Sequence, residues 1–256
     1  MLVQRWERAA ETHRHPDELI VEEPLEILLD GVRVATTMRT PGHDFELAVG
    51  FCHGDGLLGD AKVQSCRYCG TGTAVDTEFN TVSVDTGGMA PAPSPRVGTT
   101  TSSCGLCGAT AVDDLRERLR PLPPGEPWPP DLLAALPARV AAAQALFDRT
   151  GAVHSAAACD RSGEPVVVRE DIGRHNAVDK VVGRLLLDGL LPASDLALYA
   201  SGRASFEIVQ KAWAAGMGAV VAVSAPSSLA VAAAQQAGIT LCGFARGGTM
   251  NIYTGP

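Results

Sequence analysis

Short apolar runs bounded by turn-forming residues dominate the first hundred residues of the chain. They predict strands at residues 24–29, 32–35 and 81–85. Asp30-Gly31, between the first two runs, is typical of a hairpin turn. We therefore expect a β-rich region over residues 1–100.

The pattern changes after PLPPGEPWPP, residues 121–130, a connector that can form neither a helix nor a central strand. Strands are then expected at residues 153–159, 166–169, 196–200, 219–223 and 239–244, alternating with helices at 132–149, 177–190, 205–215 and 227–237. This alternation predicts an α/β domain over residues 131–256, with a largely parallel sheet and helices on both of its faces. Residues 101–130 would hold a CxxC loop, a helix and the connector.

Composition narrows the choice of partners and compartment. The 256 residues carry a net charge of −8, which repels phosphate backbones, so a nucleic acid is not expected as a partner. No apolar run approaches the roughly 20 residues that span a bilayer, and the first 20 residues do not resemble a secretory signal. The sequence therefore predicts a cytoplasmic protein without a membrane segment.

Cysteine chemistry is the first functional signal. An odd count of seven cysteines in a reducing compartment disfavours a disulfide framework. Cys104 and Cys107 form a glycine-flanked CxxC just before an expected helix, whose N-terminus favours a thiolate. A thiolate attacks another sulfur, so these two residues are candidates for sulfur transfer. Three other cysteines lie among apolar residues and are expected to be buried: Cys52, Cys159 and Cys242.

The same residues allow a structural alternative. A second CxxC, Cys66 to Cys69, could join Cys104 and Cys107 in a four-cysteine zinc site, and spacing alone leaves zinc and thiol chemistry equally open. Zinc deaminase chemistry is rejected, because His154 is not followed by the glutamate of an H-x-E motif.

Polar residues follow four successive predicted strands. Arg174 and His175 follow one strand, and Ser201 and Arg203 follow the next. Arginine offers a planar fork for phosphate, and serine beside glycine suits an anion. Asp171 could read the ring N–H groups of a purine or a pterin, or it could simply cap a helix. The last turn comprises Phe244, Ala245, Arg246, Gly247, Gly248 and Thr249. Together these ends suggest one pocket for a ligand with phosphates and a heteroaromatic ring, although a tight turn and helix caps would explain each motif separately.

Six segments together resemble the FdhD family of formate dehydrogenase accessory proteins. They are EEPLEILLDG (22–31), HDFELAVGF (43–51), SSCGLCG (102–108), EDIGRHNAVDK (170–180), SGRASFEIVQK (201–211) and GITLCGFARGGTMNIYT (238–254). The resemblance extends from about residue 20 to residue 254 in the same order.

The resemblance implies a fold, a reaction and partners. It implies an α/β three-layer sandwich similar to cytidine deaminase with an added N-terminal region, acting as a homodimer. A cysteine desulfurase would load sulfur on Cys104 as a persulfide, with Cys107 as the second cysteine of the motif. The acceptor would be the bis-molybdopterin guanine dinucleotide molybdenum cofactor of a formate dehydrogenase, bound as a substrate at Phe244 to Thr249. A GDP-like ligand would fit the same turn.

Two features depart from the family pattern. The Cys66–Cys69 pair is not part of the motif, and the charge of the last turn comes from Arg246 alone. Two alternatives therefore stay open. One is a cofactor chaperone with a four-cysteine zinc site, which would block thiol reagents. The other is a regulator that binds GDP or GTP and does not use its cysteines.

Overall fold

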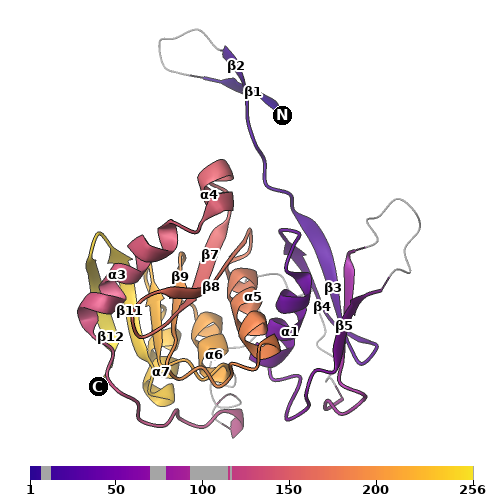
Figure 1. Cartoon of the computed structure of the whole chain (residues 1–256), viewed down its shortest axis with the longest axis vertical. Coiled ribbons are helices and arrows are strands. Elements are labelled where there is room, and N and C mark those ends of the chain that lie inside the picture. The colour runs from indigo at the N-terminus through magenta and orange to yellow at the C-terminus, as the bar shows by residue number, and fades with distance from the viewer. Residues whose placement is uncertain (7–12, 70–78, 93–114, 116, 256) are drawn as a thin grey trace.

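The computed structural model describes residues 1–6, 13–69, 79–92, 115 and 117–255. Cys104, Cys107 and most of the predicted CxxC segment lie outside the described residues. A six-stranded sheet forms one half of the described chain, and a four-stranded sheet belongs to the other (Figure 1).

The six-stranded sheet has the order β12-β11-β10-β9-β7-β8. Its strands are β7 (His154–Cys159), β8 (Pro165–Asp171), β9 (Ala197–Ala200), β10 (Ala219–Ala222), β11 (Thr240–Arg246) and β12 (Thr249–Thr254). Only the neighbouring pairs β9–β10 and β10–β11 are parallel, whereas β7 and β12 run against their neighbours. The prediction of a largely parallel sheet was wrong because β7–β8 and β11–β12 are joined by short hairpin turns, which permit only antiparallel pairing.

Helices cover both faces of this sheet, as the alternation of strands and helices predicted. α5 (Arg174–Leu187), α6 (Phe206–Ala214) and α7 (Ser228–Ala237) lie on one face, and α3 (Pro130–Ala141) lies on the other; the short α4 (Ala145–Thr150) precedes β7. Along β7, Ala156 and Ala158 join the core under α5, while Ala157 and Cys159 join the core under α3. This period of two places apolar residues on both faces of the strand, so the sheet is buried on both sides.

The N-terminal residues form a second, smaller sheet with the order β4-β3-β6-β5. Its strands are β3 (Glu23–Leu29), β4 (Val32–Arg39), β5 (Ser65–Tyr68) and β6 (Thr81–Asp85), and α1 (Asp44–Gly54) packs on it. The predicted Asp30-Gly31 hairpin is confirmed, since both residues have positive φ. A separate hairpin of β1 (Leu2–Arg5) and β2 (His13–Pro16) projects away from the body (Figure 1).

A direct backbone contact joins the two halves. α1 crosses α5 where Gly50 meets Gly183. A Cβ on Gly50 would lie 1.9 Å from the carbonyl oxygen of Asp179, and one on Gly183 would lie 1.8 Å from that of Glu46. The helices approach this closely only because neither residue has a side chain. α5 therefore packs against the large sheet on one side and against α1 on the other.

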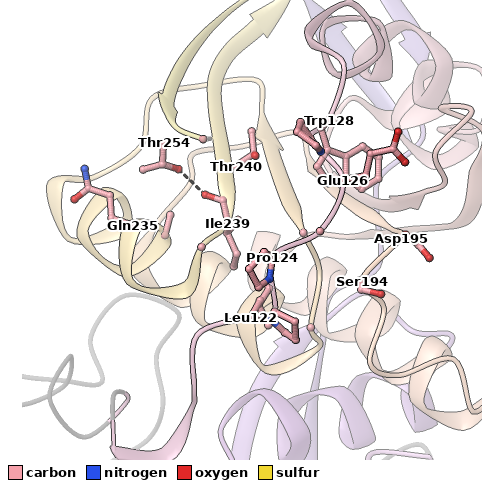
Figure 2. Close-up of a pocket in the computed structure, with 18 of the residues that line it drawn as sticks. Leu122, Pro124, Glu126, Trp128, Ser194, Asp195, Gln235, Ile239, Thr240 and Thr254 are labelled. Atoms are coloured by element: carbon pink, nitrogen blue, oxygen red, sulfur yellow. Dashed lines mark hydrogen bonds between the residues drawn. The ribbon is translucent and has the colours of Figure 1, made fainter.

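The proline-rich connector crosses the amino ends of β9, β10 and β11 and borders a cavity of about 820 Å³ (Figure 2). The guanidinium of Arg161 stacks 4.0 Å from the ring centre of Trp128 and donates to the carbonyl of Glu126 at 2.9 Å. Leu122 is held by its N–H, which donates to the carbonyl of Ala237 at 2.9 Å. The cavity lies at the sheet edge opposite to the strand ends that carry the predicted binding residues.

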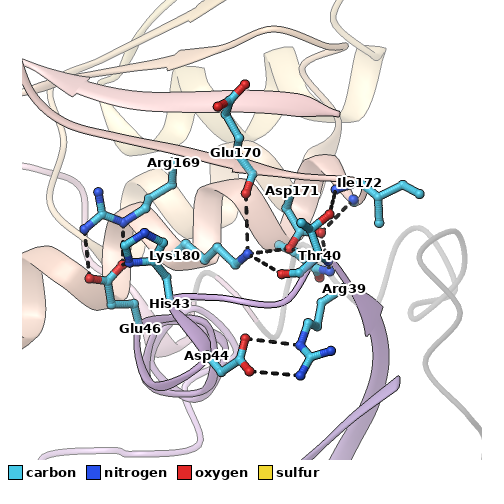
Figure 3. A network of polar contacts seen from close by, with 12 residues as sticks. Arg39, Thr40, His43, Asp44, Glu46, Arg169, Glu170, Asp171, Ile172 and Lys180 are labelled. Atoms are coloured by element: carbon cyan, nitrogen blue, oxygen red, sulfur yellow. Dashed lines mark hydrogen bonds and ion pairs between the residues drawn. The ribbon is translucent and has the colours of Figure 1, made fainter. Parts of the chain in front are cut away.

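Buried charges reinforce the contact between the halves (Figure 3). The ammonium of Lys180 lies 2.7 Å from Oδ2 of Asp171 and donates to the carbonyl of Thr40 at 2.9 Å. Oδ2 also accepts from the Thr40 N–H, and Oδ1 accepts from Gly173 and Asn176. Asp171 is fully buried with both oxygens occupied, so it has no free acceptor for a ring N–H. The expected helix cap is not seen either, because the N-cap of α5 is Gly173 and no side chain caps that helix. The ion pair with Lys180 describes Asp171 instead.

We expect the Gly183→Ala substitution to lower the free energy of unfolding by at least about 3 kcal/mol, because the new methyl group would overlap backbone atoms that cannot yield. Urea denaturation would measure the change. Gly125→Ala is the matched control, since its Cβ would meet only Arg161 at 3.9 Å, and we expect an effect within about 0.5 kcal/mol. Equal stability of the two variants would contradict the crossing.

Candidate functional site

The ends of β8, β9, β10 and β11 meet at one edge of the large sheet. Although β7 separates them, β8 and β9 run in the same direction, because each is antiparallel to β7. The loops beyond the ends are bonded in sequence: the Ser224 N–H donates to the Gly202 carbonyl at 3.1 Å, and the Phe244 N–H donates to the Ser224 carbonyl at 3.2 Å. The structure therefore brings the predicted binding residues to a common edge.

His175 and Ser201 are held by neighbours on this edge. His175 Nε2 lies 3.0 Å from both the Ser205 hydroxyl and the Glu207 carboxylate, at the start of α6. The Ser201 hydroxyl accepts from the Ser155 N–H at 2.9 Å. Both side chains are thus fixed in position, and they connect β7 with the starts of α5 and α6. Together with Arg174 and Arg203 they form what we call the rim of the candidate site.

Arg174 and Arg203 supply positive charge. Arg174 opens α5 and is half-buried, whereas Arg203 is exposed in the loop after β9. Burial, and then the charge of Arg203, lower the pKa of Arg174. Two guanidiniums that repel each other within one rim favour a bound anion.

His154 is a member of this rim that sequence reasoning did not place there. Its Nδ1 lies 3.4 Å from the Ser201 hydroxyl. Burial lowers its pKa, and the charges of Arg174, His175 and Arg203 lower it further. The residue was missed because the sheet was expected to be largely parallel, and the first residue of a parallel strand would lie at the opposite edge, whereas β7 is antiparallel to β9.

A buried ion pair lies one helical turn below the His175–Glu207 contact. Lys211 Nζ is 2.6 Å from Oδ1 of Asp179, and both residues are almost fully buried. Burial raises the pKa of Asp179 to about 7, and the ammonium of Lys211 opposes this change. This ion pair links α6 to α5.

The predicted turn from Phe244 to Thr249 is the tip of the β11–β12 hairpin. β11 continues to Arg246 and β12 begins at Thr249, so only Gly247 and Gly248 lie in the turn itself. Gly247 and Gly248 have φ of 59° and 77°, the geometry of a two-residue turn. Phe244 has φ of 53°, a strained conformation for this residue, and the residue is 38% exposed. Ala245 is fully buried, so neither its side chain nor its backbone is exposed to a ligand. Strands in a sheet lie about 4.8 Å apart, so this turn is about 19 Å from the end of β8, four strands away.

The second cysteine pair lies on a strand. Cys66 is within β5, and the Cys69 N–H donates to the Thr81 carbonyl at 2.9 Å, so the ladder continues through it. Residues three apart on an extended strand face opposite sides. Burial raises the pKa of Cys66 to about 11. Within the described part of the chain, no three His, Cys, Asp or Glu side chains gather as a metal site would require.

These features define a mixed α/β protein whose larger sheet carries two arginines, Arg174 and Arg203, at one edge. The chain belongs to the FdhD/NarQ family, whose model matches residues 20–256. The protein named "Sulfur carrier protein FdhD" of Streptomyces avermitilis is 52% identical over 250 residues, covering 94% of this chain and 88% of the relative. That of Nocardia farcinica is 50% identical over 246 residues, with the same coverage.

A solved structure shares the fold. The crystal structure of a candidate formate dehydrogenase accessory protein from Desulfotalea psychrophila aligns with a TM-score of 0.79 and 24% identity, covering 100% of this chain and 97% of that one. Over the residues that the structure describes, none of the helices has the length and apolar character needed to cross a bilayer.

We expect Cys66 to react with iodoacetamide at pH 8 at least about 100-fold more slowly in the native protein than in urea. With a pKa of about 11, only about one thousandth of this thiol is ionised at that pH. Peptide mass spectrometry would measure the rate, with Cys66→Ser as the control. Fast native alkylation would contradict this expectation, and slow alkylation that a chelator abolishes would point to a metal instead.

Proposed function

We propose that this protein is a sulfur carrier that passes persulfide sulfur from a cysteine desulfurase to the bis-molybdopterin guanine dinucleotide molybdenum cofactor of a formate dehydrogenase. The observation that carries the proposal is the 52% identity, over 94% of the chain, to a protein named as a sulfur carrier, together with the Cys104-Gly105-Leu106-Cys107 motif. The structural relative described as a formate dehydrogenase accessory protein is consistent with the acceptor. We further propose that the protein acts as a cytoplasmic homodimer with a fold similar to cytidine deaminase.

The proposed reaction has two sulfur transfers. The Cys104 thiolate attacks the outer sulfur of the desulfurase persulfide, the donor S–S bond breaks, and the donor cysteine leaves as a thiolate. The Cys107 thiolate then attacks the inner sulfur of the Cys104 persulfide, forming a disulfide and releasing the outer sulfur as hydrosulfide. The hydrosulfide becomes a terminal ligand of the molybdenum, and a thiol reductant restores the two cysteines.

The cofactor would lie along the strand-end edge as a substrate. Arg174 and Arg203, with His175 and Ser201 beside them, suit its phosphates, and the exposed ring of Phe244 suits stacking with a guanine or a pterin. The span of about 19 Å along this edge suits an extended dinucleotide. A GDP-like ligand would occupy part of the same edge.

The zinc-site alternative receives less support. A tetrahedral site needs four thiolates that converge, and an extended strand directs Cys66 and Cys69 to opposite sides. The regulator alternative would use the same edge for GDP or GTP but would give the cysteines no role. The reactivity of the cysteines therefore distinguishes the sulfur carrier, the zinc-binding chaperone and the GDP- or GTP-binding regulator.

Incubation with a cysteine desulfurase and cysteine should add the mass of one sulfur atom to the peptide that holds Cys104 and Cys107. Non-reducing mass spectrometry would measure it. The addition should be absent in the Cys104→Ala protein, and it should persist in a Cys66→Ala, Cys69→Ala double variant. No added sulfur, with one zinc retained per chain, would favour the chaperone instead.

Phe244→Ala should weaken GDP binding about tenfold, because stacking a base on an aromatic ring contributes about 1–3 kcal/mol. Calorimetry would measure the affinity. Phe147→Ala is the matched control, since Phe147 is also exposed but lies on α4. Unchanged GDP affinity in Phe244→Ala would remove this ring from the proposed site.

A further inference from the structure

The loop after β9 leaves a gap between two charged or titratable side chains. Gly202 lies between Arg174 and His154, and a Cβ built on it would be 3.4 Å from Cδ of Arg174 and 3.5 Å from Cε1 of His154. Its φ is not positive, so glycine is not required here for backbone conformation. The missing side chain instead leaves a small cradle at the rim.

One donor at this cradle has no partner. Nε of Arg174 is buried and makes no hydrogen bond to the described residues. Buried donors are nearly always paired in folded proteins, because leaving one unpaired costs free energy. An unpaired guanidinium nitrogen beside a vacant cradle is therefore a direct indication of an anionic ligand.

The charges around the cradle are unbalanced. The charged or titratable groups that face His154 are Arg174, His175, Arg203 and Asp171. Asp171 is neutralised by Lys180, and the carboxylate of Glu207 lies against His175. Glu207 also lies close enough to Arg174 to raise the pKa of that guanidinium. Two guanidiniums against this one carboxylate leave an excess of positive charge around the imidazole.

We propose that the cradle over Gly202 binds a phosphoryl group, a tetrahedral dianion, between Arg174, Arg203 and His154, and that His154 takes up a proton when the group binds. The inference rests on the proposed function in one respect: there, the phosphoryl group belongs to the dinucleotide part of the cofactor.

Proton uptake follows from the charges. In the free protein, burial and the positive neighbours hold the pKa of His154 below its usual value, so the imidazole is neutral near pH 7. A bound dianion offsets the guanidinium charges and raises that pKa. By linkage, affinity for the dianion increases as the pH falls, over the range in which His154 gains its proton.

Sulfate is the cleanest probe, since it is a tetrahedral dianion that does not titrate near neutral pH. The imidazole resonances of the full chain would be followed by NMR against pH, with and without sulfate, and the His154→Asn protein would assign the signal. We expect sulfate to raise the pKa of His154, and its affinity to rise about tenfold from about pH 8.5 to about pH 5.5. His15→Asn, on the exposed β1–β2 hairpin, is the control and should change neither result.

The Gly202→Ala variant tests whether the cradle can lose its ligand without a loss of protein stability. The added methyl group would make only ordinary contacts with Arg174 and His154, so the thermal midpoint should stay that of the native protein. Because it fills the cradle, sulfate affinity should fall at least about tenfold. Gly125→Ala should leave the affinity unchanged.

The outcomes distinguish this inference from the proposed function. Absence of sulfate binding to the native protein, or binding that Gly202→Ala does not weaken, would overturn the cradle. Binding without a change in the titration of His154 would overturn the proton uptake. Sulfate binding with that change, in a protein that accepts no sulfur on Cys104, would support the cradle and reject the sulfur carrier.

Discussion

The contact between Gly50 and Gly183 is the constraint on which the arrangement of the two halves depends. Because a Cβ at either position would overlap the other helix, α1 and α5 share a surface that no larger residue allows. α5 begins with Arg174 and His175, so the helix that fastens the N-terminal sheet also sets the rim of the candidate site. The packing of the small sheet therefore also fixes the position of the candidate site.

The pairing of buried charges determines which charged side chains are still available to contact a ligand. Lys180 is paired with Asp171 and Lys211 with Asp179, and neither pair reaches the surface. Such pairs stabilise a buried arrangement only when the geometry satisfies both partners, as it does here. Arg174 lacks a complete set of partners and Arg203 is exposed, so the free positive charge collects at the strand ends.

The chain that follows the CxxC motif returns to the opposite edge of the large sheet. Arg118 donates to the carbonyl of Gly54 at 3.2 Å, at the end of α1. The indole of Trp213 donates to the carbonyl of Arg120 at 2.8 Å, at the end of α6. α6 starts at the edge that carries the candidate site, so its last residues lie at the opposite edge of the sheet. The described segment after the thiol motif and the candidate site thus lie at opposite edges of the large sheet.

Local chemistry was sufficient to predict the Asp30-Gly31 hairpin, helices on both faces of the large sheet, and the presence of Arg174, Ser201 and Phe244 at the ends of strands. These features depend on neighbours in sequence, through turn preferences and the periodicity of apolar residues. The direction of β7, the full use of both Asp171 oxygens and the place of His154 beside Arg174 were not accessible in this way. Each depends on contacts between residues far apart in the chain. Such contacts do not produce a periodic pattern of apolar and polar residues, so a single sequence does not reveal them.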